Sequence, residues 1–152
     1  MPVSGWDEAR VLVVAHRTAA SPALLDALRD RADRGAAHFY LLVPNSPQVN
    51  WHLLHRERFQ KVTHAEEVLL LALPLIEEAV GDSVECSVSR REDPMDAIEE
   101  TLMELQFDEI ILSTLPRSVS RWLHMDLPRR VAHLGVPVTT IVGPERAAAG
   151  VA

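Results

Sequence analysis

The sequence is poor in the residues on which small disulfide-rich or membrane proteins depend. It has one cysteine, six glycines and 5% aromatic residues among 152. The single thiol, Cys86, excludes an internal disulfide framework, and its apolar surroundings in 84–88 predict a buried, unreactive side chain. No stretch approaches the roughly 18 apolar residues that span a bilayer. The N-terminus has no basic segment followed by an apolar one, so we expect no signal peptide and a cytoplasmic location.

Positive charge is also scarce, since 15 Lys and Arg residues stand against 22 Asp and Glu residues. The resulting net charge of −7 disfavours sequence-independent binding to nucleic acid. Seven histidines suggest a metal site, but His52, His55 and His64 have no consistent second set of ligands beside them. We therefore expect no metal. Because no Gly-x-Ser-x-Gly nucleophile elbow occurs either, no catalytic residue is predicted and the protein is expected not to be an enzyme.

The sequence does contain five short, β-branched runs that alternate with helix-length segments. Strands are predicted at Val11–Ala15, Phe39–Val43, Val84–Val88, Glu109–Leu112 and Val136–Val142. Such alternation is typical of an α/β fold with right-handed crossovers. We therefore predict a five-stranded parallel open sheet with helices on both faces. One domain is expected over residues 1–145, followed by a frayed tail at 146–152.

Helix starts are marked by a capping residue followed by proline. Ser21-Pro22 predicts a helix that ends near Gly35, and Asp93-Pro94 predicts another.

A different signal, a capping box formed by Thr63 and Glu66, predicts a helix that starts at residue 63 and ends near Val80. Pro74 lies inside this pattern and is expected to kink the helix. The preceding segment, 44–62, contains two prolines and Trp51 and is predicted to be a long loop that can include one helical turn. We expect it to fold over the sheet edge or the mouth as a plug or lid, where Trp122 would meet it, with a surface for protein contact as the alternative.

A ligand site is expected at the carboxyl ends of the first and fourth strands, where the strand order of such sheets reverses. Arg117 and Arg121 lie one helical turn apart and are a candidate anion clamp, with two solvated arginines as the alternative. The candidate residues around this mouth are Ala15, His16, Arg17, Thr18, Val43, Ser113, Thr114, Arg117, Ser118, Ser120, Arg121 and Asp126.

Three stretches resemble the universal stress protein family, and together they extend from about residue 10 to 142. They are 11–18, similar to the first strand and its loop, 93–98, similar to the start of the third helix, and 108–142, similar to the final β-α-β unit. The resemblance implies a homodimer formed through the last strand, which also removes an exposed edge. A monomer whose edge is covered by the C-terminal tail is the alternative. The predicted interface residues are Val136, Val138, Thr140 and Val142.

Family members that bind ATP carry Gly-x2-Gly-x9-Gly-Ser/Thr after the fourth strand, where glycines let backbone N–H groups approach the phosphates. In this sequence the same register reads Ser113-x2-Pro116-x9-Asp126-Leu127. Pro116 has no N–H group, and Asp126 places a carboxylate near the expected phosphate. His16 and Arg17 also stand where the family has Asp and Gly. ATP is therefore a disfavoured ligand, and no cofactor is expected.

Asp126 has a structural interpretation as well. Asp126-Leu127-Pro128 repeats the cap-plus-proline pattern and predicts a helix to about Leu134, with the Asp126 carboxylate as its N-cap.

The sequence thus predicts a non-enzymatic stress-response or regulatory module that forms a homodimer and does not bind ATP through a glycine loop. The alternative is a binding module for a nucleotide or another small anion, held in a different pose by 16–18 and the two arginines.

Overall fold

The computed structural model describes residues 8–44, 54–116 and 118–143, with the backbone alone over residues 54–64. The elements within these residues are β1 (Ala9–Val14), α2 (Pro22–Arg34), β2 (Ala37–Val43), α3 (Leu54–Val80), β3 (Glu85–Val88), α4 (Pro94–Glu104), β4 (Glu109–Thr114), α5 (Arg121–His124), α6 (Leu127–Ala132) and β5 (Val138–Val142). All neighbouring strands are parallel, in the order β3-β2-β1-β4-β5. The predicted α/β fold class is confirmed. No helix of the described residues is long and apolar enough to cross a membrane.

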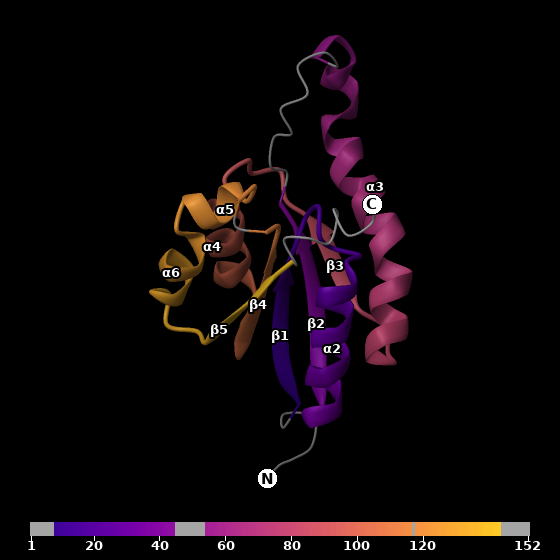
Figure 1. Cartoon of the computed structure of the whole chain (residues 1–152), viewed down its shortest axis with the longest axis vertical. Helices are drawn as coiled ribbons and strands as arrows, with labels where there is room; N and C mark the ends of the chain where they lie inside the picture. The colour runs from indigo at the N-terminus through magenta and orange to yellow at the C-terminus, as the bar shows by residue number, and fades with distance from the viewer. Residues whose placement is uncertain (1–7, 45–53, 117, 144–152) are drawn as a thin grey trace.

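The sheet separates two apolar layers, with α2 and α3 on one face and α4, α5 and α6 on the other (Figure 1). Strand β1 contributes side chains to both layers, because successive side chains of a strand point to opposite faces of the sheet. Val11 and Val13 pack with α2 and α3, whereas Leu12 and Val14 pack with α4 and α6. All four side chains are fully or almost fully buried. This explains the continuous apolar run of β1 and places its carboxyl end between the two layers.

The two caps predicted from serine or aspartate before proline are confirmed. Ser21 Oγ accepts a hydrogen bond from the Leu24 N–H at 3.2 Å, at the start of α2. Asp93 Oδ1 accepts one from the Met95 N–H at 2.8 Å, at the start of α4. Helix α2 also ends at Gly35, as predicted.

Helix α3 begins nine residues earlier than predicted, at Leu54 rather than Thr63. The capping-box prediction is therefore wrong, and so is the loop predicted over residues 54–62. The physical reason is compositional, because residues 54–62 contain neither glycine nor proline and are rich in helix-forming side chains. The helix is continuous across Pro74, so the proline does not end it, and the kink expected there stays a prediction. Residues 45–53, including Trp51 and His52, lie outside the described residues, so the predictions made for them stay predictions, as do those for the His55 and His64 side chains.

Strand β5 forms one edge of the sheet, as predicted, but starts at Val138 rather than Val136. Val136 instead packs against the core layer of α4 and α6. Pro137 separates it from the strand and lacks the N–H group that a ladder uses, while its carbonyl still accepts from the Ile110 N–H at 2.9 Å. Val136 is therefore not part of an edge strand.

Cys86 in β3 is half-buried rather than fully buried. Loss of hydration and, to a lesser degree, the negative charge of Glu77 raise the pKa of its thiol above the ordinary value. The predicted lack of reactivity agrees with this direction, because the thiolate is the reactive form.

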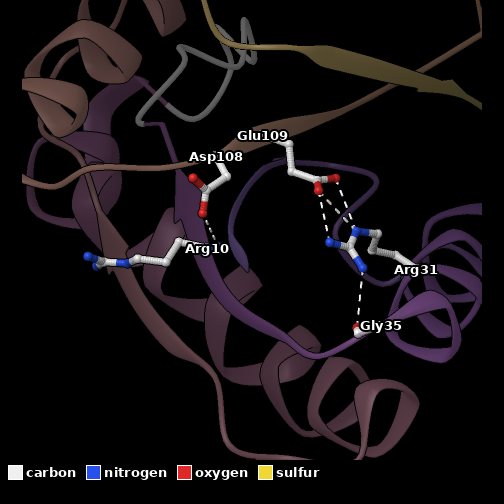
Figure 2. Close-up of polar contacts among 5 residues, drawn as sticks. All are labelled: Arg10, Arg31, Gly35, Asp108 and Glu109. Atoms are coloured by element: carbon white, nitrogen blue, oxygen red, sulfur yellow. Dashed lines mark hydrogen bonds and ion pairs between the residues drawn. The ribbon is translucent and has the colours of Figure 1, made fainter. Parts of the chain in front are cut away.

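The amino end of the sheet is held by a polar network between distant segments (Figure 2). Arg31, near the end of α2, donates from Nε to both carboxylate oxygens of Glu109 at 3.1 Å, and from Nη2 to Oε2 at 2.9 Å. Its Nη1 also donates to the Gly35 carbonyl at 3.3 Å. Beside it, the Arg10 backbone N–H donates to Asp108 Oδ2 at 2.8 Å. These contacts fasten the start of β4 to α2 and β1.

Candidate functional site

A cavity of about 490 Å³ lies at the carboxyl ends of β1 and β4. This volume is within the range of small-molecule sites, about 300 to 1,000 Å³. The strand order reverses between β1 and β4, so the cavity occupies the switch point at which such sheets bind ligands. Its lining residues are His16, Arg17, Thr18, Glu92, Asp93, Pro94, Ser113, Thr114, Leu115, Val119, Ser120, Arg121, Trp122 and Met125.

The structure brings most of the predicted mouth residues to this cavity. Those that line it are His16, Arg17, Thr18, Ser113, Thr114, Ser120 and Arg121. Ser113 and Thr114 belong to the end of β4, which extends two residues beyond the predicted end at Leu112.

Other predicted mouth residues lie elsewhere. Ala15 and Val43 are buried in the core against α2 and α3. Ser118 and Asp126 are exposed and are not among the lining residues. Arg117 lies outside the described residues, so the arginine clamp stays a prediction.

Two groups of lining residues were not predicted as site residues. Glu92 and Asp93 come from the loop between β3 and α4, and Pro94 is the first residue of α4. They reach the cavity because α4 packs against side chains of β1 and β4. The second group is an apolar wall of Leu115, Val119, Trp122 and Met125. Of these four residues, only Trp122 was singled out from the sequence, as a residue that segment 44–62 was expected to meet. The cavity thus has one apolar wall and one polar wall.

Two buried hydroxyl groups, those of Thr18 and Ser113, belong to the polar part of the cavity lining. The oxygens of Thr18 Oγ1 and Ser113 Oγ lie 2.5 Å apart, and either one can be the donor. Both side chains are almost fully buried. The bond joins the loop after β1 to the end of β4, across 95 residues of sequence. The bond therefore ties together two of the segments that line the cavity.

One backbone donor at the start of α5, the Leu123 N–H, is used by the protein itself. Ser120 Oγ accepts from the Leu123 N–H at 3.0 Å, and Ser120 is buried. A phosphate bound at a helix start depends on such N–H groups. Likewise, Asp93 Oδ1 caps α4 and Thr114 Oγ1 donates to the Leu115 carbonyl at 3.1 Å. Most of the polar wall is therefore bonded to neighbouring protein groups.

The charges that line the cavity have both signs. Arg17 and Arg121 are exposed at the mouth, and Glu92 and Asp93 stand among the same lining residues. Two cations and two carboxylates give no net positive charge with which to attract a polyphosphate.

No protein-family model and no curated protein sequence matches the chain. Solved structures do match. The universal stress protein from Archaeoglobus fulgidus superposes with a TM-score of 0.60 at 19% identity, covering 88% of this chain and 93% of that one. Its complex with dAMP gives a TM-score of 0.55 at 20% identity, covering 88% and 97%. A universal stress protein in complex with cAMP gives 0.51 at 18% identity, covering 90% and 97%.

The chain has the fold of the universal stress proteins. At these identities the likeness concerns the fold, and the chemistry of the site rests on the residues of this chain. Within the universal stress protein fold, the cavity occupies the mouth formed after β1 and β4.

Asp126 precedes α6 in a left-handed backbone conformation, with φ 57° and ψ 36°. Its side chain makes no capping hydrogen bond, so the predicted N-cap is wrong. The reason is the backbone, because a capping residue needs extended φ and ψ to aim its side chain at the first turn. Its carboxylate lies 3.6 Å from Arg129 Nε instead, and both side chains are exposed. The backbone at this aspartate has a conformation that glycine adopts without steric cost.

Proposed function

We propose that this chain is a non-enzymatic regulatory module of the universal stress protein type, which does not bind ATP through a phosphate loop. The observation that carries the proposal is the capping of α5 by Ser120, which uses the Leu123 N–H within the cavity wall. Two features support it: Pro116 has no N–H group to offer, and the charges lining the cavity include Glu92 and Asp93 beside the arginines. A triphosphate would meet two carboxylates, and the Leu123 N–H would not be available to it.

Titration of the protein with Mg-ATP by calorimetry tests this function. We expect no saturable binding below millimolar ATP and no release of phosphate, because Pro116 offers no N–H group and the Leu123 N–H is already bonded to Ser120. Saturable binding at micromolar ATP, or steady ATP turnover by the purified protein, would show that the proposal is wrong.

A second candidate function is the binding of a smaller nucleotide or another small anion in a different pose. The apolar wall with Trp122 favours it, since an indole offers a surface for stacking a base, and Arg17 and Arg121 lie at the mouth for a single phosphate. Two of the structurally similar universal stress proteins are described as complexes with dAMP and cAMP.

Replacing Arg17 and Arg121 together with alanine tests the second candidate. If AMP or cAMP binds by calorimetry, the double variant should bind it at least about tenfold more weakly, because two charge-assisted contacts are lost. Arg130→Ala is the matched control, since Arg130 is exposed on α6 and does not line the cavity. If the double variant keeps the affinity of the original protein, the arginines do not hold the ligand.

We also propose a homodimer through β5, with Val138, Thr140 and Val142 in the interface. In the part of the chain that the structure describes, the outer side of β5 has no neighbouring strand, and Val142 is exposed. Pairing with a second copy would satisfy this edge. Sedimentation analysis tests the proposal, and a monomer at all concentrations would contradict it.

A further inference from the structure

Helix α3 is apolar on two opposite faces between residues 65 and 79. Its inner face packs against the sheet through Ala65, Ala72, Ile76 and Ala79, all buried. Its outer face carries the leucine stripe, which we define as Leu70, Leu71, Pro74 and Leu75. The exposed fractions of the three leucines are 71%, 72% and 42%. A helix that is apolar all round is normally covered on all sides.

The stripe is continuous along the helix. Its residues are spaced by one, three and four positions, and side chains three and four apart are neighbours on a helix surface. Of the other large exposed apolar residues among the described ones, Val119 lines the cavity and Val142 lies on the edge strand. Met103 is 86% exposed on α4 but is isolated, because Glu99, Glu100 and Glu104 surround it. Single exposed apolar side chains need no explanation, whereas a group of them marks an interaction surface.

Acidic residues stand at both ends of the stripe. Glu66 and Glu67 lie one turn before it, and Glu78 lies one turn after it on the same face. All three are exposed, and none takes part in an ion pair within the described residues. The helix has no lysine or arginine between residues 65 and 80. The stripe is therefore an apolar surface between two negative ends.

We propose that the leucine stripe of α3 docks a protein segment that presents apolar side chains between lysines or arginines, such as a basic amphipathic helix. The apolar part would cover the leucines, and the basic ends would meet Glu67 and Glu78. Charge complementarity of this kind selects a partner and speeds its association.

The same charges argue against the two other occupants of an apolar helix face. Two copies of α3 packed antiparallel would bring Glu67 of one chain close to Glu78 of the other, and like charges in contact are destabilising. An anionic membrane surface would be repelled by all three carboxylates, since membrane-binding helices carry lysine and arginine beside their apolar face.

The proposal is tested with a fluorescent synthetic helical peptide of about five turns, with leucines on one face and arginines at both ends. The full chain should bind it saturably in fluorescence polarisation. The Leu71→Ser/Leu75→Ser variant should bind at least about tenfold more weakly, because the apolar contact is removed. Glu67→Lys/Glu78→Lys should weaken binding by a similar factor and abolish its salt dependence. Met103→Ser is the control and should bind like the original protein.

A matched peptide with glutamates in place of the arginines separates charge from apolar contact, and it should bind about tenfold more weakly than the basic one. Equal binding by the serine variant, equal binding of both peptides, or no saturable binding at all would overturn the proposal. So would a dimer in sedimentation analysis that the serine variant dissociates, because a second copy would then cover the stripe. The charge variant changes exposed residues only, so it remains informative if the serine variant does not fold.

Discussion

Arg31→Ala is expected to lower the free energy of unfolding by roughly 2 to 3 kcal/mol. The Arg31 and Glu109 side chains are 12% and 27% exposed, so the substitution leaves a carboxylate largely removed from water without its cation. It also removes the bond from Arg31 to the Gly35 carbonyl at the end of α2. Urea denaturation followed by circular dichroism measures the change.

Arg29→Ala is the matched control, since Arg29 lies on the same helix and pairs with Asp26 at 3.1 Å. That pair is 53% and 74% exposed, and exposed pairs contribute about 0 to 1 kcal/mol. The difference between the two variants therefore reports burial rather than helix composition. If Arg31→Ala changes stability no more than Arg29→Ala, the pair with Glu109 does not hold β4 to α2.

Thr18→Val is expected to lower the free energy of unfolding by about 2 kcal/mol, because it leaves the buried Ser113 hydroxyl without its partner. Ser113→Ala should have a comparable effect for the same reason. The double variant should be more stable than the sum of the two changes predicts, since both members of the pair are then gone. Thermal and urea denaturation of the three proteins give the coupling energy. Strictly additive effects would show that the two hydroxyls do not interact.

Much of the fold could be predicted from the sequence because its signals are local. The continuous apolar run of β1 and the caps at Ser21 and Asp93 each depend on a few neighbouring residues. The alternation of strands and helices then restricts the topology to a parallel sheet. Where a local signal was misleading, as at Thr63, the surrounding residues favoured continuing the helix.

The candidate site was predictable in part. Thr18 and Ser113 follow or end strands that meet at the switch point, so the topology alone brings them together. Glu92 and Asp93 were missed because they follow β3, which is an edge strand separated from β1 by β2. Only the packing of α4 brings them to the cavity. The left-handed conformation of Asp126 was missed as well. An aspartate shortly before a proline marks a helix start in the sequence, but this pattern does not show whether the backbone of the aspartate is extended or left-handed.

The residue order thus accounts for the fold class, the approximate positions of the strands, the caps at Ser21 and Asp93, and a segment after β4 that contains no glycine between residues 113 and 126. These follow from hydrophobic periodicity and local hydrogen bonding, which act between residues near in sequence. Four features could be found only in the folded chain. They are the charges of both signs that line the cavity, the bond from the Leu123 N–H to Ser120, the Arg31–Glu109 pair and the exposed side of α3. Each depends on which residues distant in sequence lie close together in the folded chain, and tertiary packing determines this. The segment after β4 has no glycine, which makes ATP a disfavoured ligand in our proposal, and in the folded chain the Leu123 N–H is bonded to Ser120.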